Sequence, residues 1–168
     1  MELNINRENN DPFYRYKMEK ISITFEGKGK QTKLNNLVNI SKNINIPVSI
    51  ILKYLGKSFS IQSNENSLSL NGHLKESNIQ EKIYEMIDFF VLCKKCNIPE
   101  ISYELDKKNI KCSCSACGSN YNLESNKKLE SKVIEFMKIY IAKNGSIINN
   151  NVKKVCENNN TNQFISPF

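Results

Sequence analysis

The sequence has no tryptophan and a single histidine, His73, so a Ser-His-Asp or Cys-His arrangement for nucleophilic catalysis is not expected. It also lacks the G-x4-G-K-[ST] motif of phosphate-binding loops, which excludes a GTPase of that type. His73 follows Asn71 and Gly72 in an expected turn, where a solvated or locally bonded surface histidine is favoured over a ligand. The chain is therefore not expected to be an enzyme in its own right.

Long apolar runs are missing as well. No stretch approaches the roughly 20 apolar residues needed to span a bilayer, so no membrane segment is expected. Residues 1–7 lack a basic region followed by an apolar core, which excludes a secretory signal. A cytoplasmic location, or otherwise a nuclear one, is therefore predicted, and in such a reducing compartment cysteines serve as metal ligands or free thiols.

Arginine is scarce: only Arg7 and Arg15 occur, although 24 Lys+Arg residues outnumber 17 Asp+Glu residues. The net charge of +7 suits an acidic partner, such as RNA or a negatively charged protein surface. A lysine-rich solvated surface explains the same excess, and charge alone favours that simpler explanation. Because arginines are so few, each one is a candidate for a specific role.

The clearest motif is formed by four of the six cysteines: Cys93-x2-Cys96, then seventeen residues, then Cys114-x2-Cys117. This spacing is typical of a zinc ribbon, in which each C-x2-C lies on a tight turn that directs two thiolates toward one point. Two such turns complete a tetrahedron with Zn–S distances of about 2.3 Å, and four thiolates leave no open position for catalysis. We therefore predict a structural Zn²⁺ site, whose metal provides much of the ribbon's folding energy.

An alternative ligand arrangement replaces this second pair with Cys112-x-Cys114. The C-x2-C turn of Cys114 and Cys117 is the better attested of the two, and Gly118 directly after it suits a backbone that ends in the left-handed region. Cys112 and Cys156 are accordingly interpreted as free thiols.

The pattern of apolar residues predicts an α+β fold in five segments. These are a flexible N-terminal tail (1–18), an α/β domain (19–92), the zinc ribbon (93–126), an amphipathic helix (127–145) and a disordered tail (146–168). Within the domain, strands are expected over 21–25 and 32–37, a hairpin over 57–70, and helices over 38–43, 47–54 and 78–92, with Gly56 closing the second. The amphipathic helix either caps the ribbon or binds a partner, and capping is favoured.

The predicted tail carries one unusual string, Phe13-Tyr14-Arg15-Tyr16. Three aromatic side chains around one arginine fit two interpretations equally: docking onto a partner, or local packing on the body of the domain. A mobile tail can carry Arg15 into a partner's site, which a core residue cannot do.

Six strings carry a resemblance to a known family: Asn6-Arg7, Asp11-Pro-Phe-Tyr-Arg-Tyr-Lys-Met18, Glu26-Gly-Lys-Gly29, Phe89-Phe-Val-Leu-Cys-Lys-Lys-Cys-Asn-Ile-Pro-Glu100, Cys114-Ser-Ala-Cys-Gly118 and Lys128-Leu129. Together, over roughly residues 4–130, they resemble the N-terminal region of the eukaryotic translation initiation factor 5 family. The second string is the most specific one. The cysteine half is shared with the β subunit of initiation factor 2.

The resemblance implies a small α/β domain similar to initiation factor 1, followed by the zinc ribbon. It implies binding to GTP-loaded initiation factor 2, which carries initiator tRNA on the small ribosomal subunit, and stimulation of GTP hydrolysis by the γ subunit during start-codon selection. Arg15 matches the family's arginine finger. Lys33 and Lys53 match two supporting lysines, the second across a two-residue deletion. The chain would then be a GTPase activator, monomeric outside the complex.

The chain departs from the family at Lys30-Gln31, where a further glycine is usual, so the loop after Gly29 is expected to be stiffer. Full-length members also carry a long acidic linker and a C-terminal helical-repeat domain, so this chain resembles either a fragment or a reduced factor. Two other functions stay open: a non-catalytic binding module like the β subunit of factor 2, and a competitive decoy of factor 5. The first predicts salt-sensitive association without a change in hydrolysis, and the second predicts slower initiation.

Overall fold

The computed structural model describes residues 1–149, and it begins with a hairpin rather than a free tail. Strands β1 (Glu2–Asn4) and β2 (Lys17–Glu19) pair antiparallel, with Leu3 opposite Met18. Ile5 and Met18 are each 1% exposed, so this segment contributes to the core. The expectation that residues 1–18 have no core of their own is therefore wrong. The few apolar residues of the segment are separated by a long polar stretch, so they produce no period that sequence reasoning could detect.

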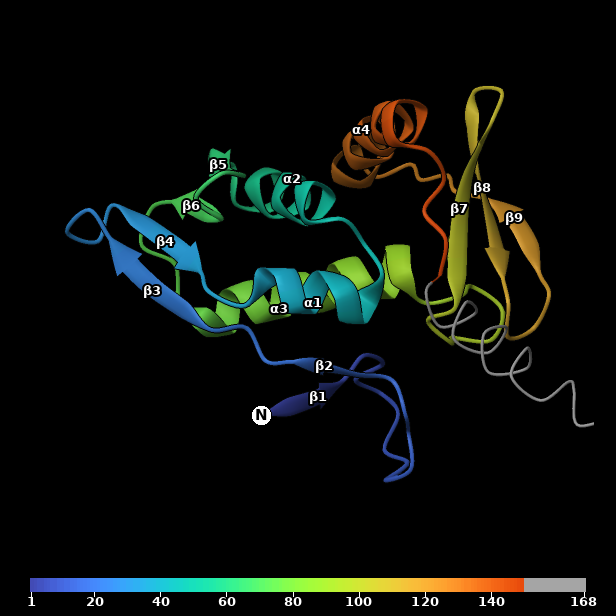
Figure 1. The fold of residues 1–168 in the computed structure, drawn as a ribbon, viewed down its shortest axis with the longest axis horizontal. Coiled ribbons are helices and arrows are strands. Elements are labelled where there is room, and N and C mark those ends of the chain that lie inside the picture. The colour runs from blue at the N-terminus through green and yellow to red at the C-terminus, as the bar shows by residue number, and fades with distance from the viewer. Residues whose placement is uncertain (150–168) are drawn as a thin grey trace, which may run out of the picture.

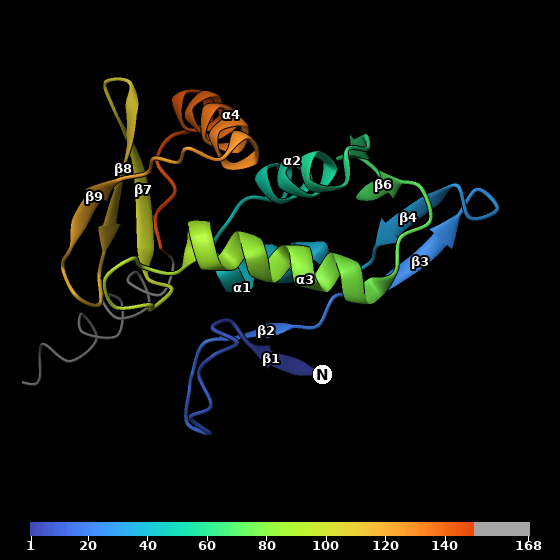
Figure 2. The same ribbon diagram turned by 180° about the vertical axis from the view of Figure 1, so that it is seen from behind.

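A four-stranded antiparallel sheet lies at one end of the molecule, in the order β3-β4-β6-β5. Three helices pack beside it, and Figures 1 and 2 show α1 and α3 between the β1–β2 hairpin and α2. The fold class is thus α+β, as the sequence predicts. The elements are β3 (Ile23–Glu26), β4 (Gln31–Leu34), α1 (Leu37–Ile44), α2 (Val48–Phe59), β5 (Ser63–Asn64), β6 (Ser69–Asn71) and α3 (Glu76–Met86).

The helical periodicity in the sequence corresponds to the buried core. Ile79, Ile83 and Met86 of α3 are at most 1% exposed, as their spacing of three and four residues predicts. The helix begins at Glu76, before the N-cap expected at Ser77, and continues from Ile87 to Val91 as a π-helical segment, η1. The core is completed by apolar side chains from the sheet and the other helices, among them Leu34, Leu37, Ile40, Ile50, Ile51, Leu55 and Leu70.

Helix α2 extends past the glycine that was expected to close it. Gly56 lies inside the helix, which ends at Phe59 with Ser60 in the left-handed conformation at φ 56°. A Cβ atom at Gly56 would come within 3.0 Å of the Ile61 carbonyl oxygen. The glycine therefore permits close backbone packing and does not stop the helix, and the hairpin predicted from residue 57 begins only at β5.

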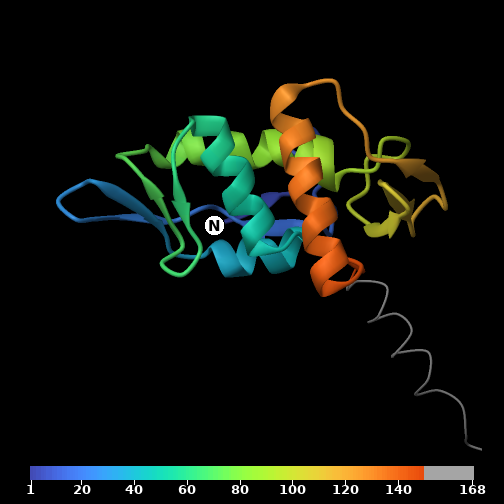
Figure 3. The same ribbon diagram turned by 90° about the horizontal axis from the view of Figure 1, so that it is seen from above.

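The ribbon is a three-stranded antiparallel sheet in the order β7-β8-β9, formed by β7 (Ile101–Asp106), β8 (Asn109–Cys114) and β9 (Asn120–Asn122). Helix α4 (Lys128–Asn144) follows and lies between α2 and the ribbon (Figure 3). It contacts β7 and β8 as well as α2, so it joins the two parts of the molecule instead of only capping the ribbon.

The chain after α4 returns to the ribbon. Ile147 exchanges backbone hydrogen bonds of 2.8 and 3.0 Å with Tyr103 of β7, so residues 146–149 do not match the disordered tail expected there. Residues 150–168, including Cys156, lie outside the described part of the chain. The predicted boundaries at residues 18, 92 and 126 stay predictions. Over residues 1–149, no helix combines the length and the apolar character needed to cross a membrane.

Replacing Ile5 with alanine tests whether the N-terminal segment belongs to the core. We expect Ile5→Ala to lower the free energy of unfolding by about 2–5 kcal/mol, because a fully buried side chain is truncated. Phe13→Ala, at a side chain 89% exposed in the same segment, is the control and should change it by less than about 0.5 kcal/mol. Urea denaturation measures both, and equal small effects would restore the free-tail interpretation.

Candidate metal centre and N-terminal arginine

Four cysteine side chains converge at the end of the ribbon nearest the α/β domain. The Sγ atoms of Cys93, Cys96, Cys114 and Cys117 all lie within 4.8 Å of one another. The Cys93–Cys117 pair is 3.8 Å apart and the Cys96–Cys114 pair is 3.6 Å apart. A tetrahedron with Zn–S distances of about 2.3 Å has S–S edges of about 3.8 Å. The four residues thus fit a tetrahedral thiolate site for a metal ion.

The two cysteine turns are built alike. The carbonyl of Cys93 accepts a 2.9 Å hydrogen bond from the N–H of Asn97, and the carbonyl of Cys114 accepts one of 2.9 Å from Gly118. Both closing residues are left-handed, with φ of 58° at Asn97 and 72° at Gly118. Gly118 behaves as the sequence predicts. Asn97 occupies the equivalent position because asparagine tolerates this conformation better than other residues with a side chain.

Hydrogen-bond donors surround the thiols. The Lys95 N–H lies 3.4 Å from the Cys93 Sγ, and the Ser119 hydroxyl lies 3.4 Å from the same sulfur and 2.8 Å from the Cys117 Sγ. Burial opposes ionisation of Cys93, but hydrogen bonds from Ser119 and from the N–H groups of Cys96 and Lys95 lower its pKa to about 6. A low pKa favours the thiolate, the form that binds metal. Sequence reasoning missed Ser119, whose position directly after the second turn was the available signal.

Cys112 lies apart from this set. It is fully buried in β8, opposite Tyr103 on one side and Tyr121 on the other. Burial raises the pKa of Cys112 to about 12, so it stays protonated at neutral pH. The structure therefore groups Cys114, and not Cys112, with the other three cysteines.

The loop between β1 and β2 is closed by its own hydrogen bonds. The Ile5 N–H donates to the Tyr16 carbonyl at 3.0 Å across the base of the loop. Near its tip, the Asp11 carboxylate accepts from the Phe13 N–H at 2.8 Å and the Asp11 carbonyl accepts from the Tyr14 N–H at 3.1 Å. Arg15 is thus presented by an ordered loop on a hairpin.

Arg15 itself is exposed but has partners on one side. Its side chain is 73% exposed, and its Nη2 atom donates to the Tyr16 hydroxyl at 2.7 Å and to Glu100 Oε1 at 2.9 Å. The Tyr16 hydroxyl donates to the same Glu100 oxygen. The guanidinium carbon lies 4.9 Å from the centroid of the Tyr16 ring, at cation–π distance.

The second arginine has a different environment. Arg7 Nη1 lies 2.6 Å from Glu81 of α3, and its Nη2 lies 3.1 Å from Asp88 of η1. Its guanidinium carbon also lies 5.3 Å from the centroid of the Tyr84 ring. Arg7 therefore fastens the loop to the helices, and Arg15 is the arginine that remains accessible.

The two predicted supporting lysines lie elsewhere. Lys33 of β4 pairs with Glu26 of β3 at 3.1 Å, and Lys53 of α2 lies 5.1 Å from the centroid of the Phe136 ring in α4. Figure 1 shows the β1–β2 loop and α2 on opposite sides of α1 and α3. No contact among residues 1–149 joins either lysine to Arg15, so the structure does not assemble the three into one site.

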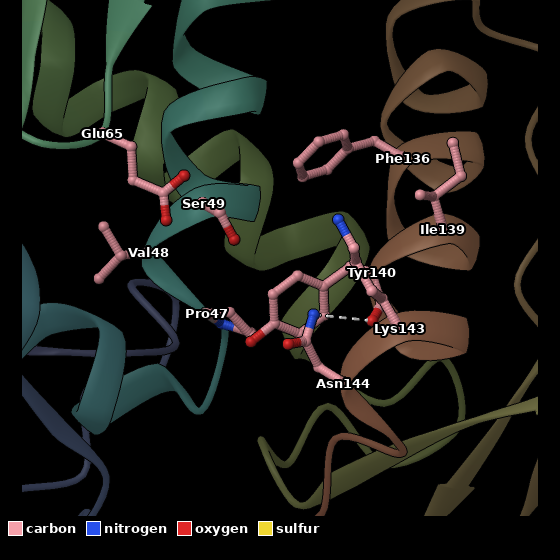
Figure 4. A pocket seen from close by; sticks show the side chains of 9 residues that line it. All are labelled: Pro47, Val48, Ser49, Glu65, Phe136, Ile139, Tyr140, Lys143 and Asn144. Carbon is pink, nitrogen blue, oxygen red and sulfur yellow. Dashed lines mark hydrogen bonds between the residues drawn. The ribbon is translucent and has the colours of Figure 1, made fainter.

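A cavity of about 760 Å³ opens between α2 and α4. Figure 4 shows Phe136 and Tyr140 reaching from α4 toward α2 across it. Its lining contains one carboxylate, Glu65, and one lysine, Lys143, with no cysteine or histidine, so it does not form a metal or acid–base site. The single histidine is elsewhere, stacked on Phe25 with ring centroids 3.9 Å apart.

These observations define a small α+β domain joined to a ribbon with two cysteine turns that fit one metal ion. The family model for a domain found in initiation factors 2B and 5 matches residues 6–120, and the chain belongs to this family.

Curated relatives agree with this assignment. The chain is 36% identical over 141 residues to eukaryotic translation initiation factor 5 of Caenorhabditis elegans, covering 80% of this chain and 32% of that protein. It is 35% identical over 142 residues to the factor of the same name from Saccharomyces cerevisiae, covering 80% and 35%. The factor of Mus musculus is 34% identical over 137 residues, covering 77% and 32%. The chain thus spans about a third of the length of these relatives.

The ligand assignment is tested by comparing Cys114→Ser with Cys112→Ser. We expect Cys114→Ser to reduce bound zinc from about one equivalent to nearly none, because the tetrahedron loses a thiolate. Cys112→Ser should keep its metal, since that thiol lies outside the cluster. Metal analysis by mass spectrometry measures both variants, and equal metal loss in the two would contradict the assignment.

Proposed function

We propose that this chain is the GTPase-activating region of a translation initiation factor similar to factor 5. In this proposal it stimulates GTP hydrolysis by the γ subunit of initiation factor 2, in complexes with initiator tRNA on the small ribosomal subunit during start-codon selection. The proposal places the chain in the cytoplasm, as a monomer outside the complex. The observation that carries it is Arg15, exposed at 73% within the Asp11–Met18 string through which the chain resembles the family.

The chemistry of phosphoryl transfer supports a role for this side chain. Negative charge spreads over the γ-phosphate oxygens in the transition state, and a permanently charged, planar guanidinium can donate paired hydrogen bonds to them. An arginine supplied in trans increases the rate by about 10³ to 10⁵, which corresponds to about 4–7 kcal/mol. Because the sequence has no phosphate-binding loop motif, the nucleotide would belong to the partner.

The accessibility of Arg15 is the structural requirement that this mechanism makes. An arginine enclosed in the core of its own chain could not reach a nucleotide bound to another protein. The Arg15 side chain is mostly exposed, and its polar contacts within residues 1–149 involve Nη2 and lie on one side. The aromatic neighbours Phe13, at 89% exposed, and Tyr14 lie on the same loop and could contact the partner during insertion.

Zinc is the metal that we propose for the four-cysteine cluster. Four thiolates with tetrahedral spacing suit Zn²⁺ and leave no open coordination position, so the ion would be structural. When bound, it would neutralise thiolate charge and link the two cysteine turns. The residues that would hold it are Cys93, Cys96, Cys114 and Cys117.

Lys33 and Lys53 are proposed as supporting residues in docking. They lie on different surfaces from Arg15, so a direct contact of all three with one phosphate group is not supported. Contacts with the surface of the partner or with RNA phosphates suit exposed lysines at separate positions.

A binding module without GTPase-activating function is the second candidate. The observation that favours it is the ion pair between Arg15 and Glu100, which gives Arg15 a partner within its own chain. This candidate predicts salt-sensitive association with factor 2 and no effect of Arg15 on hydrolysis.

Single-turnover GTP hydrolysis on reconstituted initiation complexes separates the two candidates. We expect Arg15→Ala to reduce the stimulated rate by about 10³-fold or more, and Arg15→Lys to recover little, because lysine lacks the planar paired donors. Binding to factor 2, measured by pull-down, should be retained in both variants.

Lys108→Ala is the control for loss of one positive charge, since this exposed residue lies at the β7–β8 turn. It should leave the rate unchanged. A near-wild-type rate for Arg15→Ala would reject the activator role and leave the binding module.

A further inference from the structure

Glu100 is a nearly buried carboxylate with a fixed backbone. Its side chain is 11% exposed, and it lies directly before β7 in the segment that leaves the first cysteine turn. Its N–H donates to the Ile98 carbonyl at 3.0 Å, and its carbonyl accepts from the N–H of Ser115, in the second cysteine turn, at 3.0 Å. Both cysteine turns therefore fix where this carboxylate lies. A buried carboxylate without partners would be strongly unfavourable, so the groups that contact it matter.

The Glu100 carboxylate, the Tyr16 hydroxyl and the Arg15 guanidinium form a closed set of three. Glu100 Oε1 accepts from Arg15 Nη2 at 2.9 Å and from the Tyr16 hydroxyl, and Nη2 also donates to that hydroxyl at 2.7 Å. The Tyr16 ring lies beside the guanidinium, and the Tyr14 ring contacts it in turn, with centroids 5.4 Å apart. The guanidinium is thus held through one nitrogen and one neighbouring ring.

The remaining donors of Arg15 are available. A guanidinium has five N–H donors, and the two contacts of Nη2 can use both of the hydrogens on that nitrogen. Within residues 1–149, the structure gives Nη1 and Nε no hydrogen bond. These two nitrogens form one edge of the planar group, which is the arrangement that binds two phosphate oxygens side by side.

We propose that Glu100 and Tyr16 are positioning residues, which hold Arg15 by Nη2 and direct its Nη1–Nε edge toward a partner's phosphate oxygens. This inference rests on the proposed function for its consequence in hydrolysis. Preorientation lowers the entropy lost when a long side chain engages its target, so the rate gained per hydrogen bond rises. The contact also links the metal ribbon to the N-terminal loop, since the cysteine turns hold Glu100.

The first experiment measures the orientation of Arg15 in the isolated full chain. Because the sequence contains two arginines, an NMR spectrum of arginine Nε–Hε groups has two signals, and Arg7 is an internal reference. We expect Arg15 to show a ¹H–¹⁵N heteronuclear NOE similar to that of Arg7 in the wild type. Glu100→Gln and Tyr16→Phe should lower it for Arg15 and leave Arg7 unchanged.

Glu104→Gln is the matched control, because it makes the same substitution at an exposed position of β7. It should leave both signals unchanged. Metal content and thermal unfolding check that each variant is folded, and Tyr16→Phe keeps the ring and removes only the hydroxyl if Glu100→Gln does not fold. An Arg15 signal that is as mobile in the wild type as in both variants would overturn the proposal.

The second experiment measures hydrolysis in the complex. We expect Glu100→Gln and Tyr16→Phe to lower the maximal single-turnover rate by about tenfold, with the half-saturating concentration unchanged. In an Arg15→Ala background neither should cause a further loss, because both act through Arg15. An increased rate, which a restraining contact would predict, or an additive loss would contradict positioning. A wild-type rate for Arg15→Ala would reject the proposed function, while the NMR comparison would still decide whether Glu100 orients Arg15.

Discussion

The convergence of two cysteine turns is the constraint on which the rest of the ribbon depends. The Cys93 and Cys114 turns fix four sulfurs within 4.8 Å, and the segment between the turns becomes a three-stranded sheet with little core of its own. A metal bound by these thiols would stabilise a segment that hydrophobic burial alone supports weakly. The same turns hold the backbone of Glu100, so their geometry extends to the arginine on the N-terminal loop.

The ribbon is integrated with the α/β domain through a few well-placed contacts. The buried Tyr103 hydroxyl of β7 donates to the Phe90 carbonyl in η1, where the π-helical segment leads into the first cysteine turn. Ile147 adds a backbone pair to the same strand after α4 has passed between α2 and the ribbon. A shift of the ribbon would therefore disturb η1 and α4 together. This arrangement suits a protein whose N-terminal loop must keep a defined relation to the ribbon.

The two arginines divide the work of the N-terminal segment. Arg7 is paired with two carboxylates on α3 and η1 and holds the loop against the helices, whereas Arg15 makes one ion pair and remains mostly exposed. An anchored loop with an accessible, partly oriented guanidinium suits action on a partner's nucleotide, and it differs from a free tail that must be ordered on binding. Lys33 and Lys53, on separate surfaces, suit a broad docking interface more than a single catalytic cluster.

The sequence by itself determined the features that depend on local spacing. The interval between Cys93 and Cys96 and its repeat at Cys114 and Cys117 predicted the thiol cluster, and the period of Ile79, Ile83 and Met86 predicted the buried face of α3. The family strings predicted the family to which the chain belongs.

Only the tertiary structure decided the contacts between distant segments. Arg15 and Glu100 are 85 positions apart, and Arg7 lies 74 and 81 positions from its two carboxylates, so no local period relates these groups. Folding also placed Ile5 and Met18 in the core, although the segment between them is polar. The physical reason is that a residue's neighbours along the chain govern turns and helices, whereas burial and charge pairing depend on which surfaces folding brings together.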